Sequence, residues 1–229
     1  MWRSQALNLS TGCPTLDKIL GGGIPRGCLT LIYGEAGSGK TTLALQTALK
    51  AMAEGFKTIY IDSDERLSSR RLLQMIDTLG EEVLQRMLIL RPSSFSEQTY
   101  IVESLERYIS RGVVLVVLDS ITRLYRTELS ETRDSFGLNR ELNRQMAYLS
   151  KTAKNLDLSV LTISQVRAFD KRGLEPVAGR VLRFWSSIVM RMELTAKPDV
   201  RRITVEKNSV TGKRGAFMAR ITAKGLEEV

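Results

Sequence analysis

The chain has 229 residues, of which 43% are hydrophobic and 26% charged, and it carries a net charge of +9. This composition is typical of one globular domain, so we expect a single domain over residues 1–229. The absence of histidine excludes Ser-His-Asp triads and the usual zinc sites, and two cysteines are too few for a disulfide framework. No run of about 18 apolar residues and no apolar secretory signal occurs, so we expect no membrane contact and a cytoplasmic location.

The positive charge has two interpretations. It indicates either a solvated basic surface or a surface that binds an anionic partner such as nucleic acid. The net charge alone does not distinguish between these two interpretations.

Apolar strand-like segments alternate with segments of helical spacing. Strands are predicted at 28–33, 57–64, 86–90, 113–119 and 159–165, and helices at 41–53, 68–79, 94–109 and 138–156. This alternation predicts an α/β fold with a mostly parallel central sheet flanked by helices. Three further strands are predicted at 186–194, 201–208 and 215–222, which we expect to extend the sheet in antiparallel fashion.

The segment "YGEAGSGKTT" (33–42) predicts a phosphate-binding loop. Gly34, Gly39, Lys40 and Thr41 match the pattern G-x-x-x-x-G-K-[ST] between a strand and a helix. Glycines let backbone N–H groups face an anion, and the helix N-terminus adds positive charge. Lys40 reaches the β and γ phosphates and Thr41 ligates Mg²⁺. We therefore expect ATP and Mg²⁺ to bind to Gly34, Glu35, Ala36, Gly37, Ser38, Gly39, Lys40, Thr41 and Thr42.

Polar residues follow three of the predicted strands. Asp119 ends the apolar run 113–119, where it can hold the magnesium ion together with Thr41. Three acids, Asp62, Asp64 and Glu65, lie at the end of the strand predicted over 57–64, and strand alternation predicts that Asp62 and Asp64 share a face that Glu65 does not. Gln165 ends the strand 159–165. Ligands bind beyond the carboxyl ends of parallel strands, so these side chains are expected near the phosphates.

Several segments resemble the core of RecA-superfamily ATPases. They are "LSTGCPTLDKILGGGIPRG", "LTLIYGEAGSGKTTLALQ", "YIDSDERLSSRRL", "VVLDSITRLYR" and "LTISQV", in the family's order and spacing. The resemblance covers nearly the whole chain and implies a RecA-like P-loop ATPase core. With the tail "ARITAKGLEEV" and no separate N-terminal DNA-binding domain, the chain looks like a short archaeal recombinase paralogue.

This resemblance assigns catalytic roles to Asp64, Lys40 and Gln165. The residue that orients the attacking water is usually glutamate in the family, whereas position 64 holds aspartate, which is about 1.5 Å shorter. We therefore expect weak ATP hydrolysis, with Glu65 as the alternative carboxylate. Arg71 matches the position that stacks on adenine, although it also suits an ordinary basic helix residue. Gln165 matches the residue that couples the γ-phosphate to DNA.

Two segments are candidates for contact with single-stranded DNA. The first is the predicted loop 126–140, which is balanced in charge. The second, 166–185, carries aromatic residues and the basic residues Arg167, Lys171, Arg172, Arg180 and Arg183. The alternative for this segment is a charged lid, with Phe184 and Trp185 opening a core strand. The resemblance implies a basic residue near Lys207 that reaches a neighbouring subunit's nucleotide, with Lys213 and Arg214 as alternatives. Lys207 equally suits an exposed edge-strand lysine.

The first twelve residues lack the Phe-x-x-Ala hook that family recombinases use to polymerise. We expect a monomer or small homo-oligomer that assists a full-length RecA-family recombinase or other repair proteins. The leading hypothesis is an ATP-regulated DNA-binding accessory in recombination and repair. The alternatives are a KaiC-like regulatory ATPase that does not act on DNA, and a binding module that uses ATP only as a conformational ligand.

Overall fold

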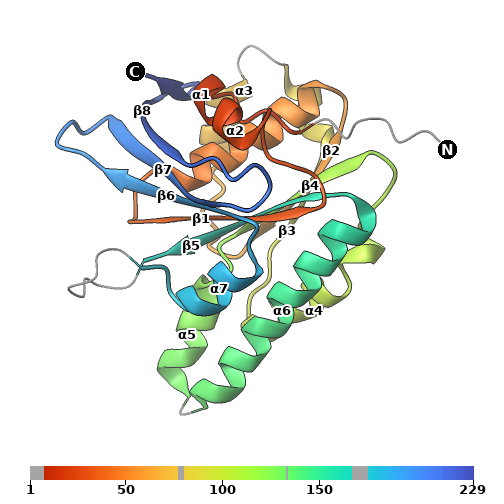
Figure 1. Ribbon diagram of the computed structural model, residues 1–229. Helices are drawn as coiled ribbons and strands as arrows, with labels where there is room; N and C mark the ends of the chain where they lie inside the picture. The colour runs from red at the N-terminus through yellow and green to blue at the C-terminus, as the bar shows by residue number, and fades with distance from the viewer. Residues whose placement is uncertain (1–7, 77–79, 133, 167–174) are drawn as a thin grey trace.

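The computed structural model describes residues 8–76, 80–132, 134–166 and 175–229. Within these residues, nine strands form one sheet in the order β3-β2-β4-β5-β1-β6-β7-β8-β9 (Figure 1). The strands are β1 Cys28–Gly34, β2 Lys57–Asp62, β3 Met87–Leu90, β4 Val113–Asp119, β5 Ser159–Gln165, β6 Ile188–Leu194, β7 Val200–Asn208, β8 Gly215–Thr222 and β9 Gly225–Glu228.

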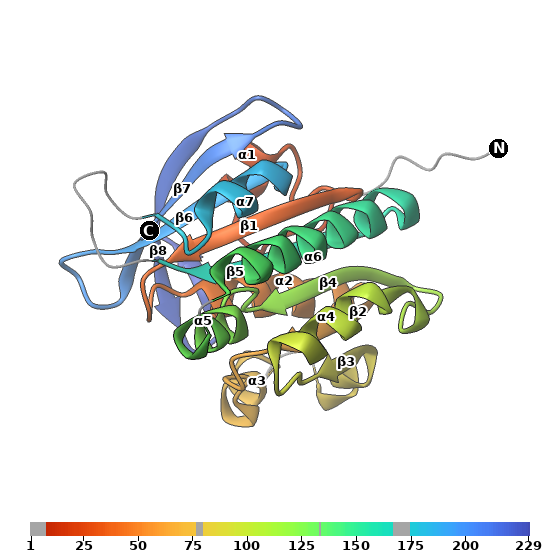
Figure 2. The ribbon, with the colours of Figure 1, turned by 90° about the horizontal axis from the view of Figure 1, so that it is seen from below.

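The helices form a layer on each face of the sheet. They are α1 Pro14–Leu20, α2 Lys40–Ala53, α3 Ser69–Ile76, α4 Phe95–Glu103, α5 Arg123–Glu131, α6 Ser135–Leu156 and α7 Gly179–Trp185, with short 3-10 helices η1 at Glu81–Arg86 and η2 at Leu105–Arg107. Helices α1 to α3 cover one face and α4 to α7 cover the other, as Figures 1 and 2 show. None of the described helices has the length and apolar character that a membrane crossing requires.

Two hydrophobic cores explain why β4 is apolar throughout. Leu115 and Val117 pack into the core beneath α2, whereas Val116 and Leu118 pack into the core beneath α6. Alternate side chains of a strand point to opposite faces, so a strand buried on both faces has no polar alternation. The predicted parallel sheet with flanking helices is confirmed.

The strand register gathers the predicted site residues at one edge of the sheet. Gly34 of β1 pairs with Gln165 of β5, and Asp62 of β2 pairs with Asp119 of β4. Because these strands are parallel, their carboxyl ends meet at the same edge.

The C-terminal extension is mixed rather than wholly antiparallel. Strand β6 pairs in parallel with β1, for example Thr30 with Ile188, and only its pairing with β7 is antiparallel. Strands β7 to β9 continue the sheet as antiparallel neighbours joined by short connections. The three predicted strands are therefore present as antiparallel neighbours, and β6 in addition joins the parallel part of the sheet through β1.

The predicted loop 126–140 is wrong, because most of it is helical. It is divided between α5 and α6, with Asp134 capping α6 through its carboxylate and the N–H of Gly137, 2.8 Å away. Tyr125 is only 2% exposed and its ring lies edge-on to Phe95, with the centroids 5.8 Å apart. This packing holds α5 against α4, and the charged surface pattern of the segment did not reveal it.

Two other boundaries differ from the expectations. Phe184 and Trp185 end helix α7 and do not open a strand. The helix predicted over 94–109 begins as expected, with the Ser94 hydroxyl accepting from the N–H of Glu97 at 3.1 Å, but it ends at Glu103. The Glu97 carboxylate accepts a hydrogen bond from the N–H of Ser93, so the cap reaches one residue further back than a capping box.

Candidate nucleotide site

The phosphate loop connects β1 to α2 and fits closely against the C-terminal strands. A Cβ at Gly34 would overlap the carbonyl oxygen of Met192 in β6, so only glycine fits there. Gly39 precedes α2 with φ of 91°, a backbone conformation that favours glycine. A Cβ at Gly37 would point into open space, so this side of the loop remains accessible. The loop is therefore packed against β6 at Gly34 and open to solvent at Gly37.

Other C-terminal contacts hold the same loop and its helix. Arg201 of β7, only 8% exposed, donates a hydrogen bond from Nε to the carbonyl of Gly37 at 3.1 Å. Gln46 of α2 accepts from the N–H of Leu226 at 2.6 Å and donates to its carbonyl at 3.2 Å. Sequence patterns gave no signal for either contact, because the partners are far apart in the chain.

Lys40 is a buried cation whose acceptors all belong to its own loop. Its ammonium group donates to the carbonyls of Gly34 at 2.9 Å and Glu35 at 2.6 Å and to the hydroxyl of Ser38 at 3.3 Å. Burial lowers its pKa to about 8, against the nearby charges of Asp119 and Asp64, which raise it. A phosphate anion in front of the loop would compensate for this burial, as expected for the lysine of a phosphate loop.

Thr41 and Asp119 form the pair predicted for Mg²⁺. The Thr41 hydroxyl donates to Asp119 Oδ2 at 2.6 Å, and the buried Tyr60 hydroxyl donates to the same oxygen at 2.8 Å. Burial raises the pKa of Asp119 to about 6, although these two hydrogen bonds lower it. Tyr60 was not predicted, because its position in an apolar strand indicates a core residue.

The donor set fits magnesium bound together with phosphates. A hydroxyl and a carboxylate beside a phosphate loop supply the oxygen ligands that Mg²⁺ prefers, with nucleotide oxygens and water completing its shell. Among the described residues, no group of three or more acidic or cysteine side chains gathers as a metal site.

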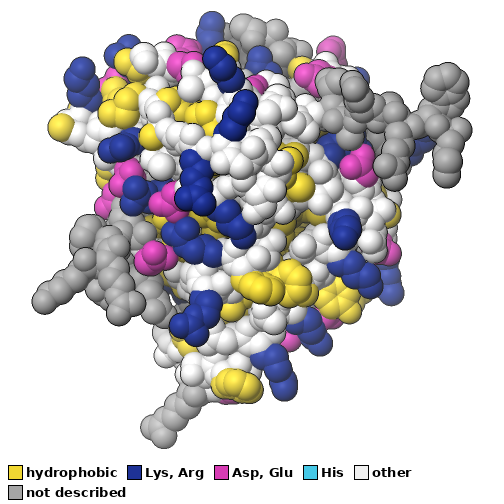
Figure 3. All heavy atoms as spheres, in the orientation of Figure 1, with side chains coloured by type: hydrophobic (Ala, Val, Ile, Leu, Met, Phe, Trp, Pro, Cys, Tyr) yellow, Lys and Arg dark blue, Asp and Glu magenta, His cyan; other side chains and the backbone are white. Residues whose placement is uncertain are grey.

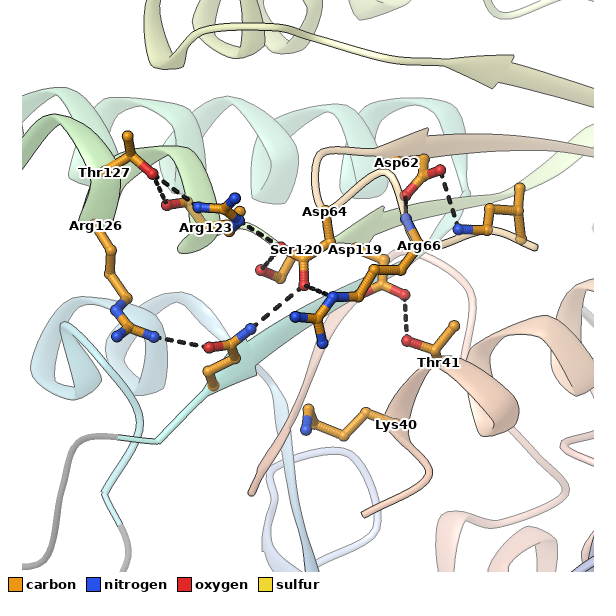
Figure 4. A network of polar contacts seen from close by, with 12 residues as sticks. Lys40, Thr41, Asp62, Asp64, Arg66, Asp119, Ser120, Arg123, Arg126 and Thr127 are labelled. Atoms are coloured by element: carbon orange, nitrogen blue, oxygen red, sulfur yellow. Dashed lines mark hydrogen bonds and ion pairs between the residues drawn. The ribbon is translucent and has the colours of Figure 1, made fainter. Parts of the chain in front are cut away.

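Asp64 lies across the cavity from Thr41, as Figure 4 shows. Its carboxylate accepts from the hydroxyl of Ser120 at 3.2 Å and from Nε2 of Gln165 at 3.4 Å. Arg66 and Arg123 approach the same carboxylate at 4.0 and 3.9 Å.

The side chains of the other two acids at the end of β2, Asp62 and Glu65, do not line the cavity that Asp64 lines. Asp62 accepts hydrogen bonds from the N–H groups of Arg66 at 3.1 Å and Leu67 at 3.2 Å, while Glu65 is exposed with φ of 52°. The expectation that Asp62 and Asp64 share a face is wrong, because β2 ends at Asp62 and strand alternation stops there.

Two adjoining cavities meet at the ends of β2 and β5. The first, the phosphate-loop cavity or nucleotide cavity, has a volume of about 190 Å³ and is lined by the phosphate loop with Asp64, Asp119 and Gln165. Arg66 and Ile221 also line it and were not predicted. The second, the arginine-lined cavity, has a volume of about 370 Å³ and is lined by Arg66, Arg123, Arg126, Thr127, Ser130 and Gln165. Gln165 connects them, since its Oε1 accepts from Arg126 at 2.7 Å and its Nε2 donates to Asp64.

The remaining predicted residues lie outside these cavities. Arg71 donates to the carbonyls of Thr222 at 2.9 Å and Ala223 at 3.1 Å, so its role at adenine stays a prediction. Lys207 donates to the carbonyl of Arg183 at 2.9 Å.

The residues predicted to bind DNA fall into three groups. Arg183 contacts Glu206 at 2.8 Å and the hydroxyl of Tyr33 at 2.7 Å, and its guanidinium lies over the Tyr33 ring. The guanidinium of Arg183 is therefore held by contacts within the protein. Arg180 is exposed on α7. The other three, Arg167, Lys171 and Arg172, lie outside the described residues.

This fold and this phosphate-loop site place the chain among the RecA-like ATPases. The Rad51 family model matches residues 2–228, so the chain belongs to the Rad51 family. The DNA repair and recombination protein RadB of Thermococcus kodakarensis is 40% identical over 226 residues, which cover 96% of this chain and 99% of that protein. RadB of Methanococcus maripaludis strain C5 is 35% identical over 214 residues, covering 93% and 96%.

A solved structure agrees with the sequence comparison. A crystal structure of the RadB recombinase superposes with a TM-score of 0.83 and 38% identity, covering 96% of this chain and 99% of that one. Within the Rad51 family, the chain therefore belongs to the RadB proteins. The prediction of a short archaeal recombinase paralogue is confirmed.

Proposed function

We propose that this chain is an ATP-binding, DNA-binding protein of homologous recombination and repair that hydrolyses ATP slowly and assists a full-length recombinase. Family membership supports the recombination role. The hydrogen bond of Thr41 with Asp119 beside the Lys40 ammonium carries the nucleotide part, because it joins a metal-ligand pair to a phosphate loop. The accessory role and a monomeric or small oligomeric state are proposed because residues 1–12 contain no Phe-x-x-Ala hook.

The residues of the nucleotide cavity have distinct roles in this proposal. Lys40 binds the phosphates, while Thr41 and Asp119 hold Mg²⁺, which neutralises phosphate charge when bound. Asp64 orients the attacking water, since its carboxylate lines the cavity and is fixed by Ser120 and Gln165. The shorter reach of aspartate accounts for slow turnover.

The arginine-lined cavity supports DNA binding. Arg123 and Arg126 project from α5 beside Gln165, and guanidinium groups bind phosphates through paired N–H donors. Lys and Arg side chains are also prominent near the middle of the face shown in Figure 3. The Gln165 bridge to Asp64 gives a route by which bound DNA and bound nucleotide influence each other.

The decisive experiment measures affinity for single-stranded DNA over a salt series, with a non-hydrolysable ATP analogue, with ADP and without nucleotide. The double variant Arg123→Gln/Arg126→Gln should flatten the dependence of log affinity on log salt by about 0.7 for each DNA phosphate that the variant no longer neutralises. Lys151→Gln/Lys154→Gln removes the same charge from exposed positions late in α6 and should bind like wild type.

Two outcomes would contradict the proposal. ATP binding without salt-dependent DNA binding would favour a KaiC-like regulatory ATPase. DNA binding without multiple-turnover phosphate release would leave ATP as a conformational ligand only.

A further inference from the structure

Arg66 lies at the boundary between the two cavities, next to the carboxylate of Asp64. It lines both the phosphate-loop cavity and the arginine-lined cavity, and its side chain is 64% exposed. Figure 4 shows the side chain reaching from the turn after β2 toward Asp64, on the side of the cavity where Lys40 lies. Among the described residues, Lys40 and Arg66 are the basic side chains that line this cavity.

The backbone of Arg66 is held firmly although its side chain is exposed. The Asp62 carboxylate accepts from the N–H groups of Arg66 and Leu67, and it also pairs with Arg91 at 3.4 Å. Leu67 is buried at 7% exposure and anchors the turn in the core beneath α2. The side chain of Arg66 therefore starts from a fixed point beside the cavity.

The guanidinium of Arg66 makes an ion pair with Asp64 but no hydrogen bond to it. Its Nε lies 4.0 Å from Asp64 Oδ2, which is beyond hydrogen-bond distance. Its guanidinium and the Lys40 ammonium line the same cavity. Two cations that face one cavity are stabilised by an anion placed between them.

We propose that Arg66 contacts the terminal phosphate of a nucleoside triphosphate bound in its own subunit. It thereby distinguishes a triphosphate from a diphosphate and stabilises negative charge on the transferring phosphoryl group. This inference rests on the proposed nucleotide binding, which supplies the other contacts. Lys40, Thr41 and the loop amides bind both nucleotides, whereas Arg66 binds only the triphosphate.

The test compares affinities for two nucleotides by calorimetry in the presence of Mg²⁺. Wild type, Arg66→Ala, Arg66→Lys and the control Arg70→Ala are titrated with a non-hydrolysable ATP analogue and with ADP. Arg70 is an exposed arginine of α3 that does not line the cavity. Loss of a charged hydrogen bond should weaken binding of the ATP analogue to Arg66→Ala by about tenfold and leave ADP binding within about twofold. Arg66→Lys should restore part of the difference, and Arg70→Ala should match wild type.

Three results would overturn the inference. The first is an Arg66→Ala variant that binds the ATP analogue like wild type or loses affinity equally for both nucleotides. The second is loss of nucleotide-independent DNA binding with the ratio of nucleotide affinities unchanged, which would place Arg66 at the DNA. The third is a wild type that binds neither nucleotide, which would refute the proposed function itself and so is distinguishable from the others.

Discussion

Replacing Asp119 by asparagine should stabilise the protein against unfolding when Mg²⁺ and nucleotide are absent. Burial raises the pKa of this carboxyl from 3.8 to about 6, even though hydrogen bonds from Thr41 and Tyr60 lower it. A carboxyl whose pKa is raised by folding stabilises the fold while it is protonated, and this contribution is lost as pH rises from about 4 through about 6. At about 1.4 kcal/mol per pH unit, the loss above pH 6 amounts to about 3 kcal/mol.

Asparagine carries no charge, so the difference in free energy of unfolding between the variant and wild type should depend on pH. Urea unfolding in EDTA should show the asparagine variant gaining about 3 kcal/mol at about pH 7.5 and about half as much at about pH 5. The exposed Glu106→Gln is the charge-matched control. A difference that stays constant between the two pH values would refute the reasoning, whatever its size.

Further predictions concern the hydrolysis, the phosphate loop and its support. Asp64→Glu should raise the rate of phosphate release, because the carboxylate extends by about 1.5 Å. The exposed Glu65→Gln should leave that rate unchanged, and an unchanged or slower Asp64→Glu would contradict this assignment. Lys40→Ala should abolish ATP affinity measured by calorimetry; retained affinity would remove the basis of the nucleotide site. Arg201→Met should lower the free energy of unfolding by about 1–3 kcal/mol and weaken ATP binding, because the Gly37 carbonyl loses a donor. Urea unfolding and calorimetry measure both effects.

The features that sequence could predict are local ones. The phosphate loop occupies consecutive residues, and Gly34, Lys40 and Thr41 are identified by their spacing between a strand and a helix. Asp119 follows from its position at the end of an apolar strand. Both needed only neighbouring residues to be recognised, and the structure brings them together at the same sheet edge.

The features that sequence missed depend on distant partners or on where an element stops. Arg183 donates to the hydroxyl of Tyr33, 150 positions earlier in the chain, and no local pattern indicates this contact; its role at DNA stays a prediction. Asp62 and Asp64 diverge because the strand ends between them, and strand boundaries are poorly marked by residue pattern. Arg66 looked like one of several arginines, and only its turn places it at the cavity.

The contacts of the C-terminal strands with the phosphate loop affect when the nucleotide site forms during synthesis and folding. Gly34 abuts Met192, Gly37 is bound by Arg201, and Gln46 of the following helix is bound by Leu226. During synthesis the phosphate loop leaves the ribosome long before the C-terminal strands that contact it. Contacts of such high sequence separation form late and slowly during folding. Affinity for ATP should therefore arise only once strands β6 to β9 have been synthesised and have joined the sheet, and nascent fragments ending before β6 should not compete for the nucleotide.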